Sequence, residues 1–307
     1  MSRRRCRFAS ELIGLVVLGG ATDAAAQACC AGSNVVTPAR LELHDDALVG
    51  IEARATDAYG SFDPTGTFVA TPPGASELDL EQDVFGALRV LPRGQVAVLV
   101  PLIETRRTVP GDKELGGGLG DLNLSARYDF IYASEARYVP GISLLVGVTF
   151  PTGTPPESAS MPLATDATGV GAYQANLGIS IEKAIGPWLV GATGLVAKRA
   201  QRTADGVTES LAAQWTALAV AAYTLRSGVA VALSGSFTAE GTATIDGMDE
   251  PGSRRRLVAI SASGVMPLSD QLRLQGAITF DPPLSSMGIN QPAAGVGLAA
   301  TVVYAWQ

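Results

Sequence analysis

From about residue 47 to the C-terminus, apolar and polar residues alternate along segments of strand length. The segment 121–132 shows the pattern: one parity is apolar and partly aromatic, and the other is polar. The apolar positions are Leu122, Leu124, Ala126, Tyr128, Phe130 and Tyr132, and the polar positions are Asn123, Ser125, Arg127 and Asp129. Because successive side chains of a strand point to opposite faces, this pattern predicts a strand with one apolar and one polar face.

Segments of this kind recur along the chain, and the connections between them are alternately long and short. The predicted strands are roughly 47–57, 78–91, 95–105, 120–132, 141–151, 171–183, 187–199, 211–225, 228–240, 255–266, 271–281 and 294–306. The long connections are 58–77, 106–119, 152–170, 200–210, 241–254 and 282–293. Tight turns on one side and long loops on the other are typical of a membrane barrel. The sequence therefore predicts an all-β, transmembrane, antiparallel up-and-down β-barrel of about twelve strands over residues 47–307.

The composition agrees with a wall that faces lipid. The chain has 307 residues, of which 47% are hydrophobic and 17% are charged, whereas soluble domains carry roughly 25% charged residues. After residue 30 no apolar run approaches the ~20 residues of a membrane helix. A soluble β-sandwich, the alternative, would need denser charge on its outer faces. The net charge of −7 argues against nucleic acid as a partner.

The first 28 residues have the form of a secretion signal. The apolar run 12–18 follows a basic region, and Ala26-Gln27-Ala28 has the small-x-small form of a cleavage site. The basic region carries Arg3, Arg4, Arg5 and Arg7. An uncleaved membrane anchor and a twin-arginine address are the alternatives. Residues 1–28 are therefore predicted to be a secretion signal peptide.

Residues 29–46 are predicted to be a periplasmic tail or a plug segment. Cys29 and Cys30 would stand at the mature terminus, and attachment of a lipid to Cys29 is one interpretation. Lipoprotein signals usually carry Leu three residues before that Cys, where this chain has Ala26. A tail with two free thiols is the other interpretation, because adjacent Cys rarely pair with each other.

The C-terminal strand ends in alternating apolar residues. Val302, Tyr304 and Trp306 share one face, and Gln307 follows the last aromatic. Such a strand is typical of chains that the barrel-assembly machinery recognises, and that machinery is therefore an expected partner. Trp306 and Trp188 also fit an aromatic belt at a membrane interface; the alternative is that both are core aromatics.

Short glycine-rich motifs occur in a characteristic order. Residues 116–122 read GGGLGDL, residues 147–153 read GVTFPTG, and residues 168–171 read TGVG. This order resembles the outer-membrane proteins grouped with the meta-pathway of phenol degradation, over roughly residues 80–307. The resemblance implies a barrel in the outer membrane of a Gram-negative bacterium, with outer-membrane lipid as its surroundings and a link to uptake of hydrophobic aromatic compounds. We interpret 116–120 as a loop that takes positive φ, since a phosphate-binding loop would need a following helix.

The sequence predicts no catalytic site, metal or cofactor, and the protein is predicted not to be an enzyme. His44 is the single histidine, and it lies ahead of the first strand beside Asp45 and Asp46. A His/Cys metal site would need further ligands, and no Gly-x-Ser-x-Gly elbow is present. We therefore interpret His44 as a solvated tail residue.

The polar faces of the strands predict a wet lumen, with Gly, Ala and Ser lining it without filling it. The candidate lumen residues are Asp79, Glu81, Asp83, Arg89, Asn123, Arg127, Asp129, Gln174, Asn176, Glu182, Arg273 and Gln275. We expect the carboxylates to pair across strands with arginines such as Arg54, Arg89 or Arg127. The row Asp79, Glu81 and Asp83 admits three interpretations: acid–base chemistry, a preference for cations, or plain solvation of a polar face.

These patterns predict a passive, non-catalytic channel or transporter for small solutes, including hydrophobic or aromatic ones. A barrel of about twelve strands has a narrow lumen that an inward-folded loop or residues 29–46 could close. The alternative is a non-conducting structural or surface-binding barrel that uses its long loops. A barrel enzyme acting on lipids is disfavoured because the predicted strands lack His.

Overall fold

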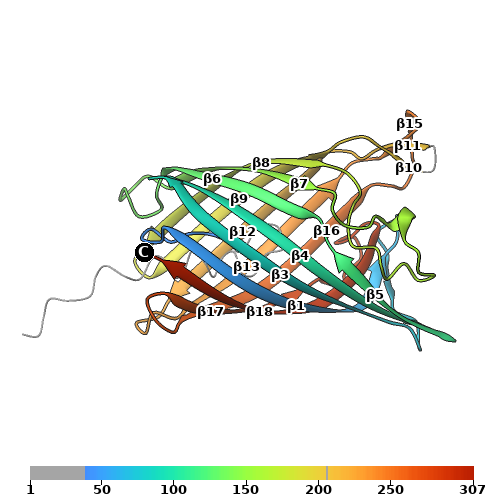
Figure 1. Cartoon of the computed structure of the whole chain (residues 1–307), viewed down its shortest axis with the longest axis horizontal. Helices are drawn as coiled ribbons and strands as arrows, with labels where there is room; N and C mark the ends of the chain where they lie inside the picture. The colour runs from blue at the N-terminus through green and yellow to red at the C-terminus, as the bar shows by residue number, and fades with distance from the viewer. Residues whose placement is uncertain (1–38, 205–206) are drawn as a thin grey trace, which may run out of the picture.

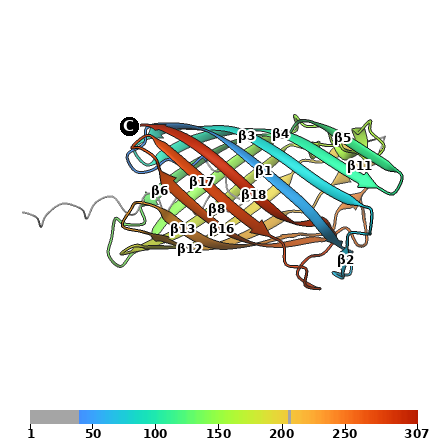
Figure 2. The ribbon, with the colours of Figure 1, turned by 90° about the horizontal axis from the view of Figure 1, so that it is seen from below.

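The computed structural model describes residues 39–204 and 207–307, and these residues form a closed β-barrel (Figures 1 and 2). Within them, twelve strands pair antiparallel in chain order, and β18 pairs with β1 to close the wall. The barrel strands are β1 (Ala47–Phe62), β3 (Ser76–Leu91), β4 (Gly94–Val109), β6 (Leu122–Ile131), β7 (Gly141–Phe150), β8 (Gln174–Ile185), β9 (Trp188–Arg199), β12 (Gln214–Thr224), β13 (Ala230–Glu240), β16 (Arg255–Pro267), β17 (Leu272–Phe280) and β18 (Gln291–Trp306). The predicted architecture is confirmed.

Residues 106–119 were predicted to be a long loop, and this prediction is wrong because most of them belong to strands. Strand β4 continues to Val109, and β5 (Asp112–Leu119) pairs with it as a hairpin that extends the wall. The glycines at 116–118 are extended residues of β5 and have no positive φ, because this pairing satisfies their backbone groups. Smaller elements in the long connections are β2 (Phe68–Ala70), η1 (Pro156–Ser158), β10 (Arg202–Ala204), β11 (Val207–Ser210), β14 (Thr244–Ile245) and β15 (Met248–Asp249).

The outer face of the wall is apolar. On β6, Leu124 is 47% exposed and Phe130 is 53% exposed, whereas Arg127 between them is buried. Exposed apolar side chains of the same kind cover the other strands, including Ile51, Val84, Ile179, Leu233, Ile278 and Leu298. A continuous exposed apolar surface of this size marks contact with lipid. The alternative of a soluble β-sandwich is therefore wrong, because the strands close into one barrel with the apolar faces outside.

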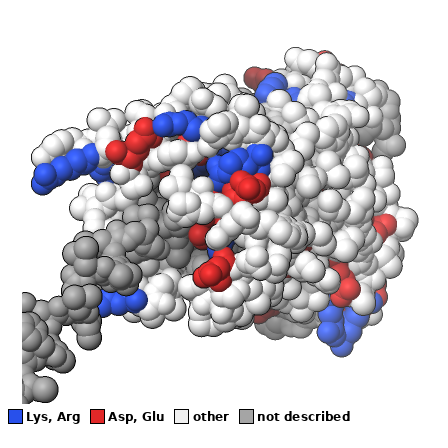
Figure 3. Space-filling view, turned by 60° about the vertical axis from the view of Figure 1, so that its left-hand side comes forward, with Lys and Arg blue, Asp and Glu red and all other residues white. Residues whose placement is uncertain are grey.

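Three aromatic pairs lie at the end of the barrel that carries the short turns. Their ring centroids lie 4.9 Å apart in the pairs Trp188–Tyr223 and Tyr304–Trp306, and 5.1 Å apart in Tyr128–Phe130. Trp188 and Trp306 are about half exposed and lie on the outer surface rather than in the core. Figure 3 turns this end toward the viewer and shows charged side chains at the rim and a largely uncharged outer wall beside it. This arrangement fits an interfacial girdle.

The interior of the same end is filled with apolar side chains. One buried cluster comprises Ala39, Leu41, Leu48, Phe85, Ala87, Ala97, Val303 and Ala305, and another comprises Leu189, Ala222, Ala230, Ala232 and Val265. The expectation that small inward residues leave the lumen unfilled is therefore wrong at this end. The two clusters also explain why the segments 211–225 and 294–306 are apolar on both faces, because their inward side chains pack in these clusters. No helix in the described part of the chain is long and apolar enough to cross a membrane.

Candidate functional site

Residues 39–46, hereafter the N-terminal segment, lie inside the short-turn end of the barrel, directly before β1. Ala39 is 1% exposed and Leu41 is 7% exposed, and both pack in the apolar cluster described above. The Gln95 side chain on β4 accepts a hydrogen bond from the Leu41 N–H at 3.1 Å and donates one to the Ala39 carbonyl at 2.9 Å. The Gln95 side chain therefore satisfies two backbone hydrogen-bonding groups of the segment, as a neighbouring strand would.

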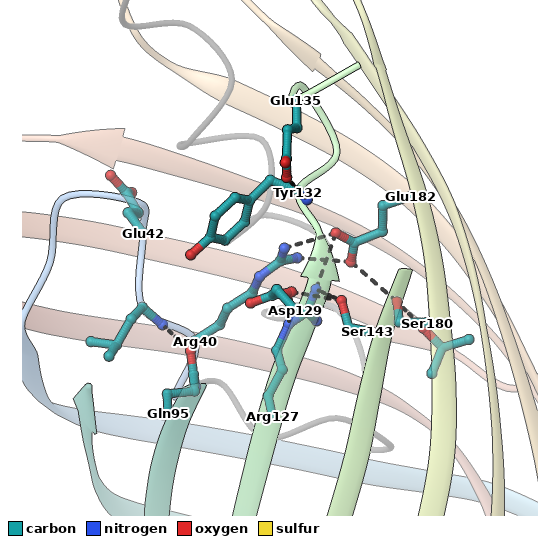
Figure 4. Close-up of polar contacts among 12 residues, drawn as sticks. Arg40, Glu42, Gln95, Arg127, Asp129, Tyr132, Glu135, Ser143, Ser180 and Glu182 are labelled. Carbon is teal, nitrogen blue, oxygen red and sulfur yellow. Dashed lines mark hydrogen bonds and ion pairs between the residues drawn. The ribbon is translucent and has the colours of Figure 1, made fainter. Parts of the chain in front are cut away.

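Arg40 attaches the segment to one side of the wall. Its guanidinium forms a two-point ion pair with Glu182 on β8, at 2.9 and 2.7 Å (Figure 4). Arg127 on β6 lies 3.3 Å from the same carboxylate and donates hydrogen bonds to Asp129 at 2.8 Å and Ser143 at 2.7 Å. Paired guanidinium and carboxylate groups of this geometry are strong and specific.

Asp45 attaches the segment to another side of the wall. Its fully buried carboxylate accepts two hydrogen bonds from Arg273 on β17, both at 2.8 Å. Glu42 lies 3.1 Å from the same guanidinium. Arg89 on β3 donates to the carbonyls of Asp45 and Glu42, so the expectation that Arg89 pairs with a lumen carboxylate is wrong. The segment is thus bound to β3, β4, β8 and β17.

On the long-loop side of the segment the barrel encloses a cavity of about 260 Å³, hereafter the central chamber. Ala39 and Arg40 form part of its floor. Its wall carries the carboxamides of Gln95, Asn123, Gln174, Asn176 and Gln214, the hydroxyls of Ser125, Thr216 and Thr238, and the apolar residues Ala97, Leu145, Leu195 and Ala197. The chamber is therefore a largely uncharged polar space.

The part of the inner wall formed by β1 and β3, hereafter the acidic wall, carries several carboxylates. Arg54 pairs with Glu81 at 2.8 Å and also with Glu52. Asp79 accepts a hydrogen bond from Thr105 at 2.8 Å, and Asp83 is 3% exposed with one carboxylate oxygen that has no hydrogen-bond partner. Carboxylates outnumber guanidinium groups among these described residues, so this wall is negative.

The structure places the candidate lumen residues on the inward face of their strands, and it brings half of them into two charged groups. Arg127, Asp129 and Glu182 join one network, whereas Asp79, Glu81 and Asp83 line the acidic wall. Gln174 and Asn176 bond to each other at 2.9 Å in the chamber, together with the nearby Asn123, and Gln275 is buried on β17 beside Arg273. His44 is exposed, and the neighbouring Asp45 binds Arg273.

Several residues of the site were missed by the sequence reasoning. They are Arg40, Asp45, Glu52, Arg199 and Glu240. Arg199 and Glu240 lie at the long-loop rim of the chamber, 2.9 Å apart. Glu52, Arg199 and Glu240 occupy the alternating positions that face inward on their strands, so the alternation could have identified them. Arg40 and Asp45 precede the first strand and had no periodic signal.

The glycine-rich motifs meet in space at the base of the long loop 152–170, in a group hereafter called the loop clasp. The Asp121 carboxylate accepts hydrogen bonds from the Gly153 N–H at 3.0 Å and the Val170 N–H at 2.7 Å. The Thr152 hydroxyl donates to the Gly120 carbonyl at 2.6 Å. A Cβ on Gly153 would lie 2.8 Å from the Cα of Gly169. The motifs therefore hold the loop rather than a ligand.

Beyond the clasp, the loop folds over the inward face of the wall. Glu114 on β5 accepts hydrogen bonds from the Leu163 N–H at 3.1 Å and the Thr165 hydroxyl at 2.7 Å. Arg107, on the inward face of β4, donates to the Leu163 carbonyl at 2.7 Å. Thr165 is fully buried as a result. These contacts bind the loop to the β4–β5 hairpin.

We expect Asp121→Ala to loosen the loop without unfolding the barrel. The substitution removes two hydrogen bonds to a charged acceptor, so cleavage of loop 152–170 by thermolysin should become about tenfold faster. Asp112→Ala is the control, because that exposed carboxylate bonds the N–H of the adjacent Lys113. Equal cleavage rates for the two variants would show that the clasp does not hold the loop.

Comparison with known proteins supports the same fold. No family profile and no curated protein matches the sequence. The COG4313 outer membrane channel from Pseudomonas putida F1 superposes with a TM-score of 0.69 and 15% identity, over 85% of this chain and 96% of that one. This protein is an outer-membrane β-barrel. In bacterial barrels of this fold the short turns face the periplasm and the long loops face the outside of the cell.

Other solved barrels are more distant from this outer-membrane barrel. The translocator domain of the autotransporter NalP from Neisseria meningitidis has a TM-score of 0.44 and 9% identity, over 85% of this chain and 88% of that one. The NanC porin has a TM-score of 0.44 and 7% identity, over 83% and 98%. The predictions for residues 1–28 and for Cys29 lie outside the described residues.

Proposed function

We propose that this outer-membrane barrel is a passive, non-catalytic channel for small solutes, closed at its periplasmic end by the N-terminal segment. One observation carries the proposal: a charged segment is bound inside the end of a barrel that encloses a polar chamber. The likeness to a solved outer membrane channel supports it. Lasting single-channel currents in planar bilayers, recorded before and after removal of the segment, test it.

The chamber favours polar solutes. Its lining in the described residues combines amide, hydroxyl and aliphatic side chains with the ion-paired Arg40 and Arg127, and contains no aromatic ring. Phe85 faces inward near the periplasmic end, but its ring packs over Gly50, where a Cβ would lie 2.3 Å from it. We therefore propose polar solutes in place of the hydrophobic aromatic compounds that the sequence resemblance implies. The measurement is the increase in solute uptake over protein-free liposomes, because phenol crosses a bilayer unaided; a larger increase for phenol than for glycerol would contradict this choice.

The acidic wall should give the open channel a preference for cations. Replacing Asp79→Asn, Glu81→Gln and Asp83→Asn together removes negative charge from the lumen, so we expect the reversal potential in a salt gradient to move toward zero. The measurement uses a variant that lacks residues 39–45. Glu104→Gln is the matched control, because Glu104 is exposed and alternates with the inward residues of β4. An unchanged reversal potential in the triple variant would contradict the proposal.

A second candidate function is a non-conducting barrel that binds partners through its long loops. The observation that favours it is the binding of the N-terminal segment inside one end of the lumen, together with a long loop that is held in a defined conformation against the β4–β5 hairpin at the other end. A folded variant without the segment that still carries no current would support this candidate.

A further inference from the structure

The charged groups around the central chamber are already paired with one another. Arg40 and Arg127 share Glu182 at the floor, and Arg199 binds Glu240 at the rim. A charged solute would have to compete with these pairs, and breaking a buried pair is costly. The chamber therefore offers little to a ligand with a full charge.

The neutral groups, by contrast, keep free hydrogen-bonding capacity. Among the described residues, the Asn176 amide accepts a bond from Gln174 but its own NH₂ has no partner, and the Gln214 NH₂ is likewise free while its oxygen accepts from Arg199. The Asn123 NH₂ donates to Thr149, which leaves its carbonyl oxygen free. Ser125 adds a hydroxyl with no protein partner. Free donors and free acceptors thus line one space.

The same chamber has one apolar ledge. Leu145 on β7 and Leu195 on β9 lie across from Gly178 on β8, and a Cβ on Gly178 would lie 2.2 Å from a methyl of Leu195. The glycine therefore leaves room for Leu195 to extend over β8. A ligand in the chamber can rest an apolar face on this ledge while its polar groups reach the amides.

We infer that the central chamber is a binding site for an uncharged, hydroxyl-rich solute of about monosaccharide size. A hydroxyl both donates and accepts, so it can satisfy the free NH₂ groups and the free oxygens at once. The volume of about 260 Å³ lies just below the range usual for drug-sized ligands, which suits a small solute. The inference rests on the proposed channel function and names its solute class.

Saturation-transfer NMR on the full-length protein, folded in deuterated detergent, tests the inference. The probes are glucose, cationic glucosamine and anionic glucuronate, which share the pyranose ring and have similar size and different charge. We expect glucose to show the strongest transfer. Asn176→Leu and Gln214→Leu should each weaken glucose binding about five- to tenfold, the effect of losing one hydrogen bond. Gln82→Leu is the control, because that amide is exposed on the outer face of β3.

Ala197→Trp provides a second test, because it fills the chamber without removing a polar group; glucose transfer should then be lost. Heat-modifiable migration on gels shows that each variant is folded. The inference is overturned if wild-type protein gives no glucose signal, if either charged probe equals glucose, or if the chamber variants behave like Gln82→Leu. Binding is measured with the N-terminal segment in place. A failure here therefore leaves the bilayer test of the channel function separate.

Discussion

Deletion of residues 39–45 should convert a barrel with little or no conductance into one with lasting single-channel currents, several-fold larger than any in the intact protein. The deletion removes Ala39 and Leu41 from the apolar cluster and releases Arg273 and Glu182 into a lumen that water can enter. Planar-bilayer recording of the two proteins at matched concentration gives the comparison.

The control is a substitution within the same segment that leaves its attachments intact. Leu43→Ala with His44→Ala serves, because both side chains are exposed. This variant should conduct as the intact protein does. If the deletion variant migrates as a folded, heat-modifiable barrel and remains silent, residues 39–45 are not what closes the lumen.

Arg273→Leu should release the N-terminal segment while leaving the barrel folded. The change leaves the carboxylates of Asp45 and Glu42 without the cation that both contact. Removing one partner of a buried ion pair costs about 3–5 kcal/mol, which shifts an equilibrium by roughly 150- to 4,000-fold. The strand ladder does not depend on this pair, so the cost falls on docking of the segment.

Trypsin measures this release directly, since Arg40 is a cleavage site that docking buries against Glu182. Cleavage after Arg40 should accelerate by roughly the same 150- to 4,000-fold, because proteolysis follows the population of the open form. Arg93→Leu is the control: its pair with Glu135 is about 35–40% exposed and contributes ~1 kcal/mol or less. Equal cleavage rates in Arg273→Leu and the unmodified protein would contradict the prediction.

The wall of the barrel could be predicted from the sequence because its signals are local. Alternation along a strand such as Leu122–Ile131 and the turn residues around Gly186 operate within a dozen residues, so they appear in a linear chain. The boundaries of β4 and β5 could not be predicted from the sequence, because the glycines at 116–118 resemble a flexible loop until their pairing with β4 is known.

The closure of the lumen depends on contacts between distant parts of the chain. Arg40 lies 142 residues before Glu182, and Asp45 lies 228 residues before Arg273. Neither has a pattern around it that indicates its partner. Inward apolar residues such as Phe85 and Val303 have the same difficulty, because their inward direction is hidden in strands that are apolar on both faces. Only the folded barrel shows that they surround the N-terminal segment.

The pair between Asp45 and Arg273 spans the seam at which β18 meets β1, since Asp45 precedes the first strand and Arg273 belongs to the penultimate one. An incomplete barrel that lacks its last strands offers Asp45 no cation. The lumen can therefore be sealed only after the final strands have been added. Docking of the N-terminal segment in the lumen therefore indicates that the barrel is complete. A barrel interrupted during biogenesis would differ from a finished one by its accessible N-terminal segment.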